Sequence, residues 1–486
     1  MHPDKSKTLS IVWFRQDLRL EDNPALVAAA KRGAILPVYI HSPEEEGAWA
    51  PGAASQYWLH QSLKSLAKKL QGKKSRLIFR RGPTDSALKK LLQETGASAV
   101  FFNRRYEPAI VQRDTELKKT LQKSGVRIES FKANLLFDPW EIATGQGEPY
   151  KVFTPFWKNC LSRPEPLGDP LTLPKITVPK LWPESLELED FELEPKIPWT
   201  QGIAATWKVG EAGAQEQLDA FLEDALKDYS EERNRPDHAG SSKLSPHLHF
   251  GEISPRQIWS AIQREMALGK KSGIAKGSEC YLKELGWREF AHHLLYHFPE
   301  TSERPLRREF EKFPWEKNTK ALKAWQRGMT GYPMVDAGMR ELWATGWMHN
   351  RVRMLVASFL VKHLMIPWQR GAEWFWDTLV DADLANNTLG WQWTAGCGAD
   401  AAPYFRIFNP ISQGPKFDPH GEYVRQWVPE LAKLPTEYIH RPWEAPAEIL
   451  ARAKIKLARD YPLPIVDHRE ARHRALIAFK KLKGKI

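Results

Sequence analysis

The run SIVWF at residues 10–14 opens a series of five short apolar segments that decides the fold. It is followed by ILPVYIH at 35–41, RLIF at 76–79, AVFFN at 99–103 and VRIESF at 126–131. These runs are rich in β-branched or aromatic residues, which is typical of buried strands. Segments with a helical pattern, such as 53–70 and 84–94, separate them. The alternation predicts an α/β domain with a parallel sheet over residues 1–131.

Two phosphate-binding fingerprints are missing from this domain. Neither GxGxxG nor GxxxxGK[ST] follows any of the predicted strands. The first domain is therefore predicted to be Rossmann-like but to lack the usual nucleotide site.

Two changes of pattern divide the rest of the chain. Residues 132–207 are rich in proline, which interrupts long helices, so we predict an interdomain connector that runs over the surface. From residue 208 onward apolar residues follow a 3.6-residue period, and we expect helices around 277–297, 337–363 and 372–379. Residues 208–486 are therefore predicted to form a large all-α domain.

Composition narrows the class of protein. The 486 residues carry 71 Lys and Arg against 59 Asp and Glu, a net charge of +12, which suits a polyanionic partner such as nucleic acid. Cys160, Cys280 and Cys397 form no CxxC pattern, which argues against a disulfide scaffold and a structural zinc site. The N-terminus is polar, and no run approaches the ~18 apolar residues that a spanning helix needs. We expect a cytoplasmic monomer with no membrane segment and no metal.

Residues 381–410, DADLANNTLGWQWTAGCGADAAPYFRIFNP, combine carboxylates, amides, indoles and glycines, which suits a cofactor pocket with stacking walls. Together with WFRQDLRL at 13–20 and GWMHNRVRM at 346–354, this segment resembles the photolyase/cryptochrome family. The resemblance spans nearly the whole chain. Within the family it is most similar to the class I type of photolyase that repairs cyclobutane pyrimidine dimers. It implies an α/β antenna-type domain ahead of a helical domain that binds FAD and DNA.

The resemblance implies which residues hold FAD in its reduced, anionic form. It places Tyr229 and the segment 241–245 at the phosphates and ribose, where hydroxyls and backbone N–H groups are suitable donors. The members of that segment are Ser241, Ser242, Lys243, Leu244 and Ser245. At the polar edge of the isoalloxazine ring it places Arg353, Asp381, Ala382 and Asp383, whose charges favour an anionic ring. Asn387 is implied beside flavin N5, where plant cryptochromes usually carry Asp.

A second group of residues is implied around the damaged bases. Glu284 and Trp287 are three residues apart on a predicted helix and share a face, so a carboxyl group lies next to an aromatic plate. Trp393 is implied as the opposite wall of the pocket, so that two indoles enclose the flipped dimer.

The predicted helix through residue 350 supplies a second face of this pocket. Asn350, Arg353 and Met354 share that face, and Arg351 points aside toward a phosphate. The (6-4) photolyases carry His where Asn350 and Met354 stand, so this pair favours cyclobutane dimers.

Three further features complete the interpretation. The resemblance makes Trp391, Trp368 and Trp315 an electron relay, from proximal to distal, that can reduce photoexcited flavin.

His292, His293 and His297 have helical spacing, but no carboxylate or third ligand is suitably spaced nearby, so we expect no metal. Folate-antenna enzymes carry polar residues where this chain has Ala109, Ile110 and Glu303, so the second chromophore stays open between a deazaflavin, a reduced folate, or none.

The resemblance, with these residues in the implied positions, implies light-driven repair of pyrimidine dimers in DNA. The protein would dock electrostatically, accept a flipped-out dimer and split it with an electron from photoexcited reduced FAD. The alternative from another class is a cryptochrome-like photoreceptor that binds flavin but repairs nothing. Helix 469–485 is basic, and we expect it to be a solvated surface helix rather than a dedicated nucleic-acid arm.

Overall fold

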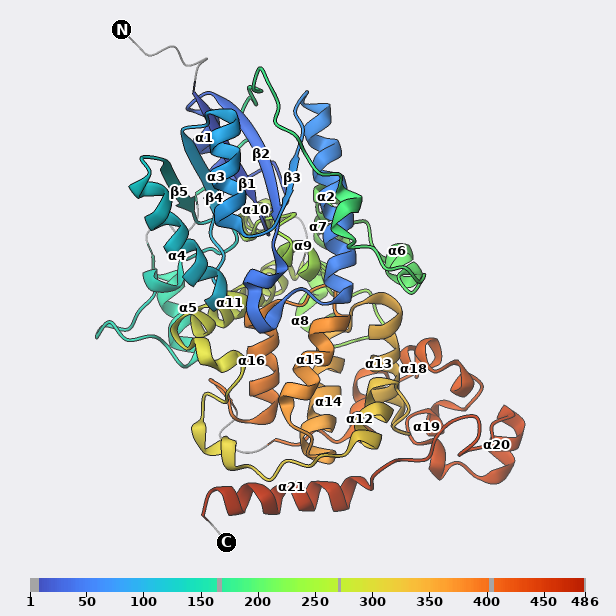
Figure 1. Ribbon diagram of the computed structural model, residues 1–486. Helices are drawn as coiled ribbons and strands as arrows, with labels where there is room; N and C mark the ends of the chain where they lie inside the picture. Colours follow the sequence, from blue (N-terminus) through green and yellow to red (C-terminus); the bar gives the residue numbers. More distant parts are fainter. Residues whose placement is uncertain (1–7, 164–167, 270–271, 402–405, 485–486) are drawn as a thin grey trace. The chain divides into compact units, whose positions relative to one another are not determined.

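The computed structural model describes residues 8–163, 168–269, 272–401 and 406–484 (Figure 1). Two compact units divide the chain. Unit 1 comprises Met1–Lys227 and Ser242–Pro299, and unit 2 comprises Asp228–Ser241 and Glu300–Ile486. The predicted fold class, a parallel α/β domain combined with a large helical domain, is confirmed. The predicted boundaries at residues 131 and 207 stay predictions.

Unit 1 is built on a five-stranded sheet with the order β3-β2-β1-β4-β5. The strands are β1 (Leu9–Phe14), β2 (Ala34–His41), β3 (Ile78–Arg81), β4 (Ala99–Asn103) and β5 (Arg127–Phe131). All four pairings are parallel, and β1 pairs with both β2 and β4. The winding direction therefore reverses at β1, and the carboxyl ends of β1 and β4 form the switch point where such sheets place ligands.

Four helices connect the strands: α1 (Pro24–Ala30), α2 (Ala53–Gly72), α3 (Thr84–Thr95) and α4 (Pro108–Lys123). Leu88 and Leu91 of α3 and Leu117 and Leu121 of α4 join the buried side chains of one sheet face, including Trp13 of β1. The core of this face therefore consists of leucines from two helices against β-branched and aromatic residues from the sheet.

In the described part of residues 132–207, which were predicted as a connector, the helices are all short. These are η2 (Pro139–Glu141), α5 (Phe153–Leu161), η3 (Leu188–Phe191) and α6 (Gln201–Thr206). Part of the segment returns to the sheet, where Leu186 N–H donates to Phe79 O at 3.1 Å and forms a bridge with edge strand β3. Covering this edge removes unpaired backbone groups that would otherwise invite another strand.

The remaining helices of unit 1 are α7 (Glu211–Ala220), η4 (Phe221–Ala225), α9 (Ser245–His249), α10 (Pro255–Leu268) and α11 (Ile274–His297). Helix α11 packs against both α10 and α5. The short turn η5 (Leu226–Asp228) follows η4. The Pro-rich segment and α11 thus belong to one core.

Arg19 links three separate parts of unit 1. Its side chain is completely buried, at 0% exposed. The guanidinium donates to the carbonyl oxygens of Asp22 (3.0 Å), Ala133 (3.0 Å) and Gly251 (2.8 Å), and to Oδ1 of Asn134 (3.1 Å). One cation therefore holds the loop after β1, the start of the Pro-rich segment and the turn before α10 together.

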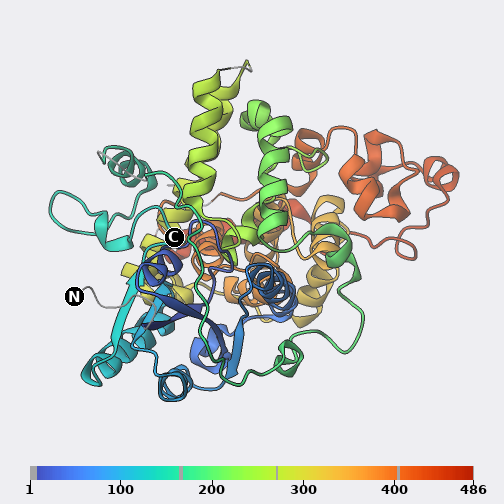
Figure 2. The same cartoon turned by 90° about the horizontal axis from the view of Figure 1, so that it is seen from above.

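Unit 2 is helical. Its helices are α8 (Tyr229–Glu232), α12 (Thr319–Gln326), α13 (Pro333–Thr345), α14 (Asn350–Ser358), α15 (Trp368–Thr378), α16 (Leu384–Ala395), α17 (Pro410–Phe417), α18 (Glu422–Trp427), α19 (Thr436–Ile439), α20 (Ala447–Ala453) and α21 (His468–Leu482). The π-helical turn η8 (Phe359–His363) extends α14, and shorter turns are η6 (Pro299–Ser302), η7 (Arg308–Lys312), η9 (Pro429–Leu431) and η10 (Pro442–Glu444). Within this unit α18 to α20 gather beside the central helices α12 to α16 (Figures 1 and 2).

The helix predicted over 337–363 is wrong as a continuous element. Gly346 adopts φ 68° and ends α13, and its N–H bonds to Leu342 O. His349 then starts α14, because its side chain accepts from the N–H of Arg351. The break matters because it places Asn350 at the first position of a new helix.

In the part of the chain that the structure describes, no helix combines the length and the apolar character needed to cross a membrane.

Replacing Arg19 by Met should lower the free energy of unfolding by about 3–5 kcal/mol, because three buried carbonyl oxygens and the half-buried amide of Asn134 lose their donor. Urea titration of purified protein measures this change. Arg127→Met, at an exposed position, is the matched control and should change stability little. Equal effects of the two substitutions would contradict the role assigned to Arg19.

Candidate functional site

The predicted site residues divide between the two units. Unit 1 holds Ser242, Lys243, Leu244, Ser245, Glu284 and Trp287, and unit 2 holds all the others.

An ion pair lies at the start of α14 in unit 2. Arg353 Nη2 and Asp381 Oδ2 are 2.8 Å apart, and the Asp381 side chain is buried. Arg353 Nε also donates to Met348 O at 2.7 Å, and its guanidinium lies 5.8 Å from the centre of the Trp347 ring. Met348 and Trp347 both belong to the turn that follows Gly346. This turn therefore holds the Arg353 side chain in a single orientation beside the Asp381 carboxylate.

The turn before α16 positions the next three predicted residues. Asp383 is the N-cap of α16 and accepts from the N–H of Asn386 at 2.8 Å. Ala382, between Asp381 and Asp383, is buried. One turn into α16, Asn387 donates from Nδ2 to Ala372 O at 3.1 Å, which fixes its amide against α15. A carboxylate and an oriented amide therefore lie four residues apart on one helix.

Arg351 is held by two contacts from distant parts of unit 2. Its Nη2 donates to Asn234 Oδ1, and its guanidinium lies 4.6 Å from the centre of the Phe417 ring. Its Nη1 is 3.8 Å from Met354 Sδ, and Asn350 beside it is exposed. The sequence offered no signal for Asn234 or Phe417, which orient the cation.

His349 lies under this face and stays neutral. It is buried, and burial together with the charges of Arg351 and Arg353 lowers the pKa of His349 to about 3. The cations at this face are therefore arginines, and their charge does not vary around neutral pH.

The three tryptophans predicted to form an electron relay all lie in unit 2 and differ in exposure. Trp391 and Trp368 are both 2% exposed, whereas Trp315 is half-buried. The Trp391 ring lies directly on α15, where a Cβ at Gly371 would approach its Cη2 to 2.0 Å. Beside Trp315, the N–H of Glu316 donates to Met365 O at 2.7 Å, which brings this segment to the chain just before Trp368.

Trp393 belongs to α16 as well and is half-buried. Two residues from Trp391, it points away from the buried tryptophan, as the helical period requires. Asn387, Trp391 and Trp393 are therefore all placed by a single helix.

In unit 1, Glu284 and Trp287 lie on α11, as predicted, and both are half-buried. One face of the Trp287 indole stacks on Phe153 of α5, with ring centres 3.8 Å apart and planes within 8°. Phe153 is itself buried. The sequence missed Phe153 because the Pro-rich segment was interpreted only as a connector.

The segment 241–245 leads into α9. Ser242 Oγ accepts from the Tyr281 hydroxyl at 2.9 Å, and Lys243 adopts a left-handed φ of 50°. Burial, with a smaller contribution from the charge of Glu284, outweighs the opposing Ser242 hydrogen bond and raises the pKa of Tyr281 to about 12, so its hydroxyl remains a donor. Leu244 is buried and Ser245 exposed at the first position of α9, while Tyr229 and Ser241 lie in unit 2.

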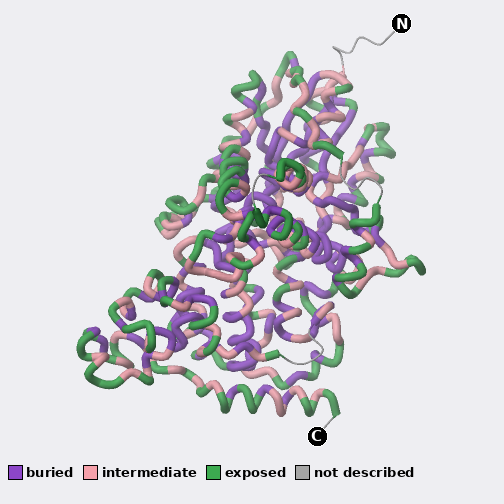
Figure 3. Tube along the Cα trace, turned by 180° about the vertical axis from the view of Figure 1, so that it is seen from behind, coloured by how far each residue is buried: buried purple, intermediate pink, exposed green. Residues whose placement is uncertain are grey.

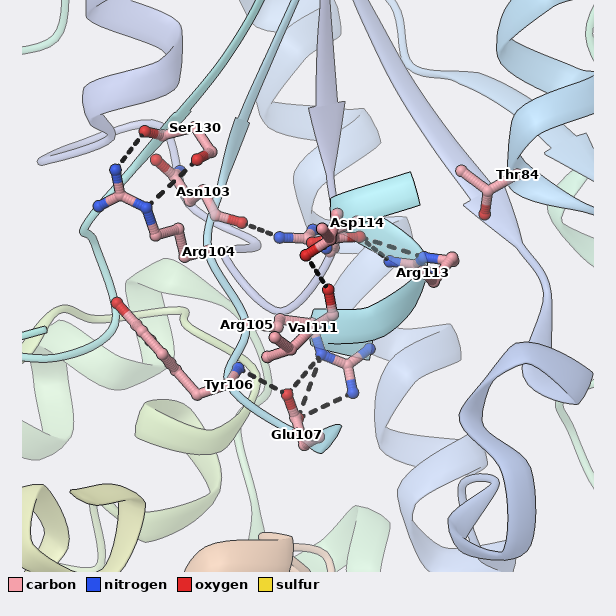
Figure 4. A network of polar contacts seen from close by, with 12 residues as sticks. Thr84, Asn103, Arg104, Arg105, Tyr106, Glu107, Val111, Arg113, Asp114 and Ser130 are labelled. Carbon is pink, nitrogen blue, oxygen red and sulfur yellow. Dashed lines mark hydrogen bonds and ion pairs between the residues drawn. The ribbon is translucent and has the colours of Figure 1, made fainter. Parts of the chain in front are cut away.

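The carboxyl ends of the strands in unit 1 are crowded with ion pairs (Figure 4). Arg105 pairs with Glu46 and Glu107, each at 2.8 Å. Arg15 is buried and pairs with Asp114 at 2.6 Å. These charges neutralise one another at the switch point of the sheet.

At the antenna positions that the sequence singled out, Ile110 is buried in α4 and Ala109 precedes it. Glu303 belongs to unit 2.

The histidine cluster makes structural contacts. His293 Nδ1 and His297 Nε2 both lie 3.1 Å from Pro139 O. Among the described residues no three His, Cys, Asp or Glu side chains form a group that could hold a metal ion.

Comparison with known proteins places these features in a family. Residues 10–175 match the family model described as DNA photolyase, and residues 281–481 match the FAD binding domain of DNA photolyase. A deoxyribodipyrimidine photo-lyase of Agrobacterium fabrum is 49% identical over 97% of this chain and 98% of its own length. Cryptochrome-1 of Arabidopsis thaliana is 44% identical over 96% of this chain and 69% of its own length.

A solved structure agrees closely. The crystal structure of a bacterial class III photolyase from Agrobacterium tumefaciens superposes with a TM-score of 0.95 at 48% identity, covering 100% of this chain and 99% of the other. The fold and the two family models thus define a protein of the photolyase type with the FAD-binding domain of the photolyases. This chain belongs to the DNA photolyase/cryptochrome family, as its motifs predicted, and is an enzyme of the DNA photolyase type.

The stack on Phe153 holds the indole of Trp287 in one orientation. Phe153→Leu keeps apolar volume but removes the ring, so Trp287 loses its fixed orientation and binding to dimer-containing DNA should weaken about 3- to 10-fold. Binding to undamaged duplex should stay within twofold. Both affinities can be measured by fluorescence anisotropy.

Phe156→Leu is the matched control, because Phe156 lies on the same helix, is equally buried and packs on Phe290 and His293 instead. An equal loss in both variants would reduce Phe153 to ordinary core packing.

Proposed function

We propose that this protein repairs cyclobutane pyrimidine dimers in DNA, using light and an electron from reduced FAD. The observation that carries the proposal is α14, which presents Asn350, Arg351, Arg353 and Met354 within its first five residues. An amide and a thioether at these positions suit a dimer that needs an electron and hydrogen bonds but no proton transfer from His.

The residues present fit a flavin. The pair of half-buried Arg353 and buried Asp381 supplies a fixed cation and anion, and Asp383 and Asn387 follow on the next element. Hydroxyl and backbone donors at the start of α9 suit a pyrophosphate. Reduced FAD, when bound, supplies the electron after it absorbs light. Arg353 favours an anionic ring, and the Asn387 amide cannot protonate it as an acid would.

The chain's own residues then perform recognition. Arg351, oriented by Asn234 and Phe417, contacts a backbone phosphate of DNA. Trp287, supported by Phe153, and Trp393 stack on the flipped bases. The carboxyl group of Glu284, half-buried on α11 beside Trp287, forms a hydrogen bond with a pyrimidine carbonyl and stabilises the negative charge that develops there.

Resupply of electrons to the flavin is a separate task, which we assign to Trp391, Trp368 and Trp315. The gradient from two buried indoles to a half-buried one suits transfer of an electron inward from the surface. Lesion binding and resupply of electrons therefore use different residues.

A second chromophore in unit 1 is part of the proposal, with a deazaflavin or a reduced folate as candidates. Because Ile110 is buried, it argues against a folate bound at Ala109, Ile110 and Glu303. An absorption spectrum of the purified protein tests this directly.

A cryptochrome-like photoreceptor is the second candidate function. The 44% identity to a plant cryptochrome favours it. Asn387 favours repair, since plant cryptochromes resemble this chain elsewhere but usually carry Asp there. Repair of a defined thymine dimer in the light decides between the two, because a photoreceptor leaves the dimer intact.

Glu284→Ala should lower repair per absorbed photon severalfold while FAD content stays unchanged, because the hydrogen bond to the charged dimer is lost. Glu284→Gln, whose amide still donates, should retain more activity than Ala. The measurement is the quantum yield of dimer splitting by chemically reduced enzyme. A quantum yield insensitive to both substitutions would remove Glu284 from the dimer site.

Trp315→Phe should slow photoreduction of oxidised flavin at least tenfold, because the surface end of the relay is lost. Repair by enzyme that has been chemically reduced beforehand should stay within twofold of the wild type. Flavin absorbance and dimer repair are followed in parallel. If both fell together, Trp315 would be structural rather than part of a relay.

A further inference from the structure

The C-terminal helix α21 lies beside the surface end of the relay. The Trp315 ring is 4.5 Å from the Phe313 ring, which is 6.1 Å from Phe310, and Phe310 is 6.3 Å from Phe479 of α21. Arg474 of α21 also pairs with Glu316, next to Trp315, at 3.6 Å. Within unit 2, the relay therefore ends under a basic helix.

Helix α21 is firmly anchored on its inner side. Ala471, Ala475 and Ala478 form a buried stripe that allows close approach to the helices beneath. His468 Nδ1 is 2.8 Å from Nε2 of the buried His363, and Arg474 donates to His363 O at 2.8 Å. The outer side is exposed along its length (Figure 3).

The exposed side is strongly basic. Arg469, Arg472, Lys480 and Lys481 are exposed, and Glu470 is the single acid in the sequence of this helix. Around Trp315 itself, exposed Lys312, Lys317 and Lys320 extend the same sign of charge. A field of this kind attracts anionic partners and raises their association rates 10- to 1000-fold at low salt.

This basic surface is separate from the proposed DNA contact in unit 2. Asn350 and Arg351 begin α14, whereas η8, which ends at His363 and packs on α21, continues from the other end of α14. At 1.5 Å per residue the two ends of this continuous helix are about 20 Å apart. Helix α21 therefore packs at the end of this continuous helix that lies away from Arg351. We expect its positive charge to attract an anionic partner other than the DNA that Arg351 contacts.

We propose that α21 and Trp315 form a docking surface for an acidic electron-carrier protein. In the proposed step, the carrier gives one electron to the Trp315 indole after that indole has lost one to the relay. Trp315 returns to its neutral state, and the carrier is oxidised by one electron. The proposal rests on the relay assigned above as part of the proposed function.

The size of the surface favours a protein over a small anion. A helix of 15 residues is about 22 Å long, and its charges run from the first turn to the last. A small reductant would need only one or two of these charges. A folded carrier with an acidic face would contact them together.

The experiment uses oxidised, FAD-loaded, full-length protein and laser-flash spectroscopy. The probes are two ferrous haem proteins that each give one electron, acidic cytochrome b5 and basic cytochrome c. The readout is the second-order rate at which each probe removes the tryptophan radical signal. At low salt, cytochrome b5 should react at least 10-fold faster than cytochrome c, and 0.5 M NaCl should largely remove the difference.

The charge-reversed variant R469E/R472E/K480E/K481E should invert this preference and keep its FAD content. The matched control K73E/K74E/K119E/K123E makes the same change of charge at exposed positions of unit 1 and should preserve the wild-type preference. Rates that are equal for both probes, or unaltered by reversal on α21, would overturn the docking surface. Loss of undamaged-duplex binding in the α21 variant, with donor rates unchanged, would make the helix a nucleic-acid arm instead.

Two further measurements separate failure of this inference from failure of the function. Trp315→Phe should form no long-lived surface radical, which tests the relay. Repair of dimers by pre-reduced wild-type enzyme tests the repair function. If repair and the radical are both present without donor selectivity, only the docking surface is rejected.

Discussion

The buried guanidinium of Arg19 is the interaction on which unit 1 depends. Four acceptor oxygens from the loop after β1, the Pro-rich segment and the turn before α10 converge on one cation. The close approach requires Gly251, because a Cβ there would meet Gln16 O at 2.1 Å. Burying an unpaired charge is costly, so bringing these segments together around Arg19 stabilises the domain. Helices α10 and α11 then continue from a fixed starting point.

In unit 2 the helix α16 positions several of the predicted site residues, because successive residues of a helix point in different directions. Asp383 caps α16 and so sets its start, and Asn387, Trp391 and Trp393 follow at positions that face different directions. The ring of Trp391 lies on the backbone of α15 at Gly371, which admits no side chain. The Asn387 amide and the Trp391 and Trp393 indoles are therefore rigidly related to one another. Such rigidity suits electron transfer and base stacking, both of which depend on fixed geometry.

Charge is used differently in the separate parts of the molecule. At the carboxyl ends of the sheet, Arg105 and Arg15 are matched by carboxylates within hydrogen-bond distance. On α21 the exposed cations outnumber the single acid, and the field extends outward. The net charge of +12 is therefore not a uniform property of the surface. Part of it is concentrated on a helix beside Trp315.

Local pattern was enough to predict the parallel strands, the helical second half and the family, because strand and helix periods and short motifs are contained within neighbouring residues. The shared face of Glu284 and Trp287 followed from the same rule. The tertiary structure alone decided the break at Gly346, the support of Trp287 by Phe153 and the contact of Arg351 with Asn234. The last two contacts join residues 134 and 117 positions apart by the difference of their numbers, and Arg19 reaches Gly251 across 232. No local period encodes such contacts, because they form only when buried groups find partners that the chain has brought back from far along the sequence.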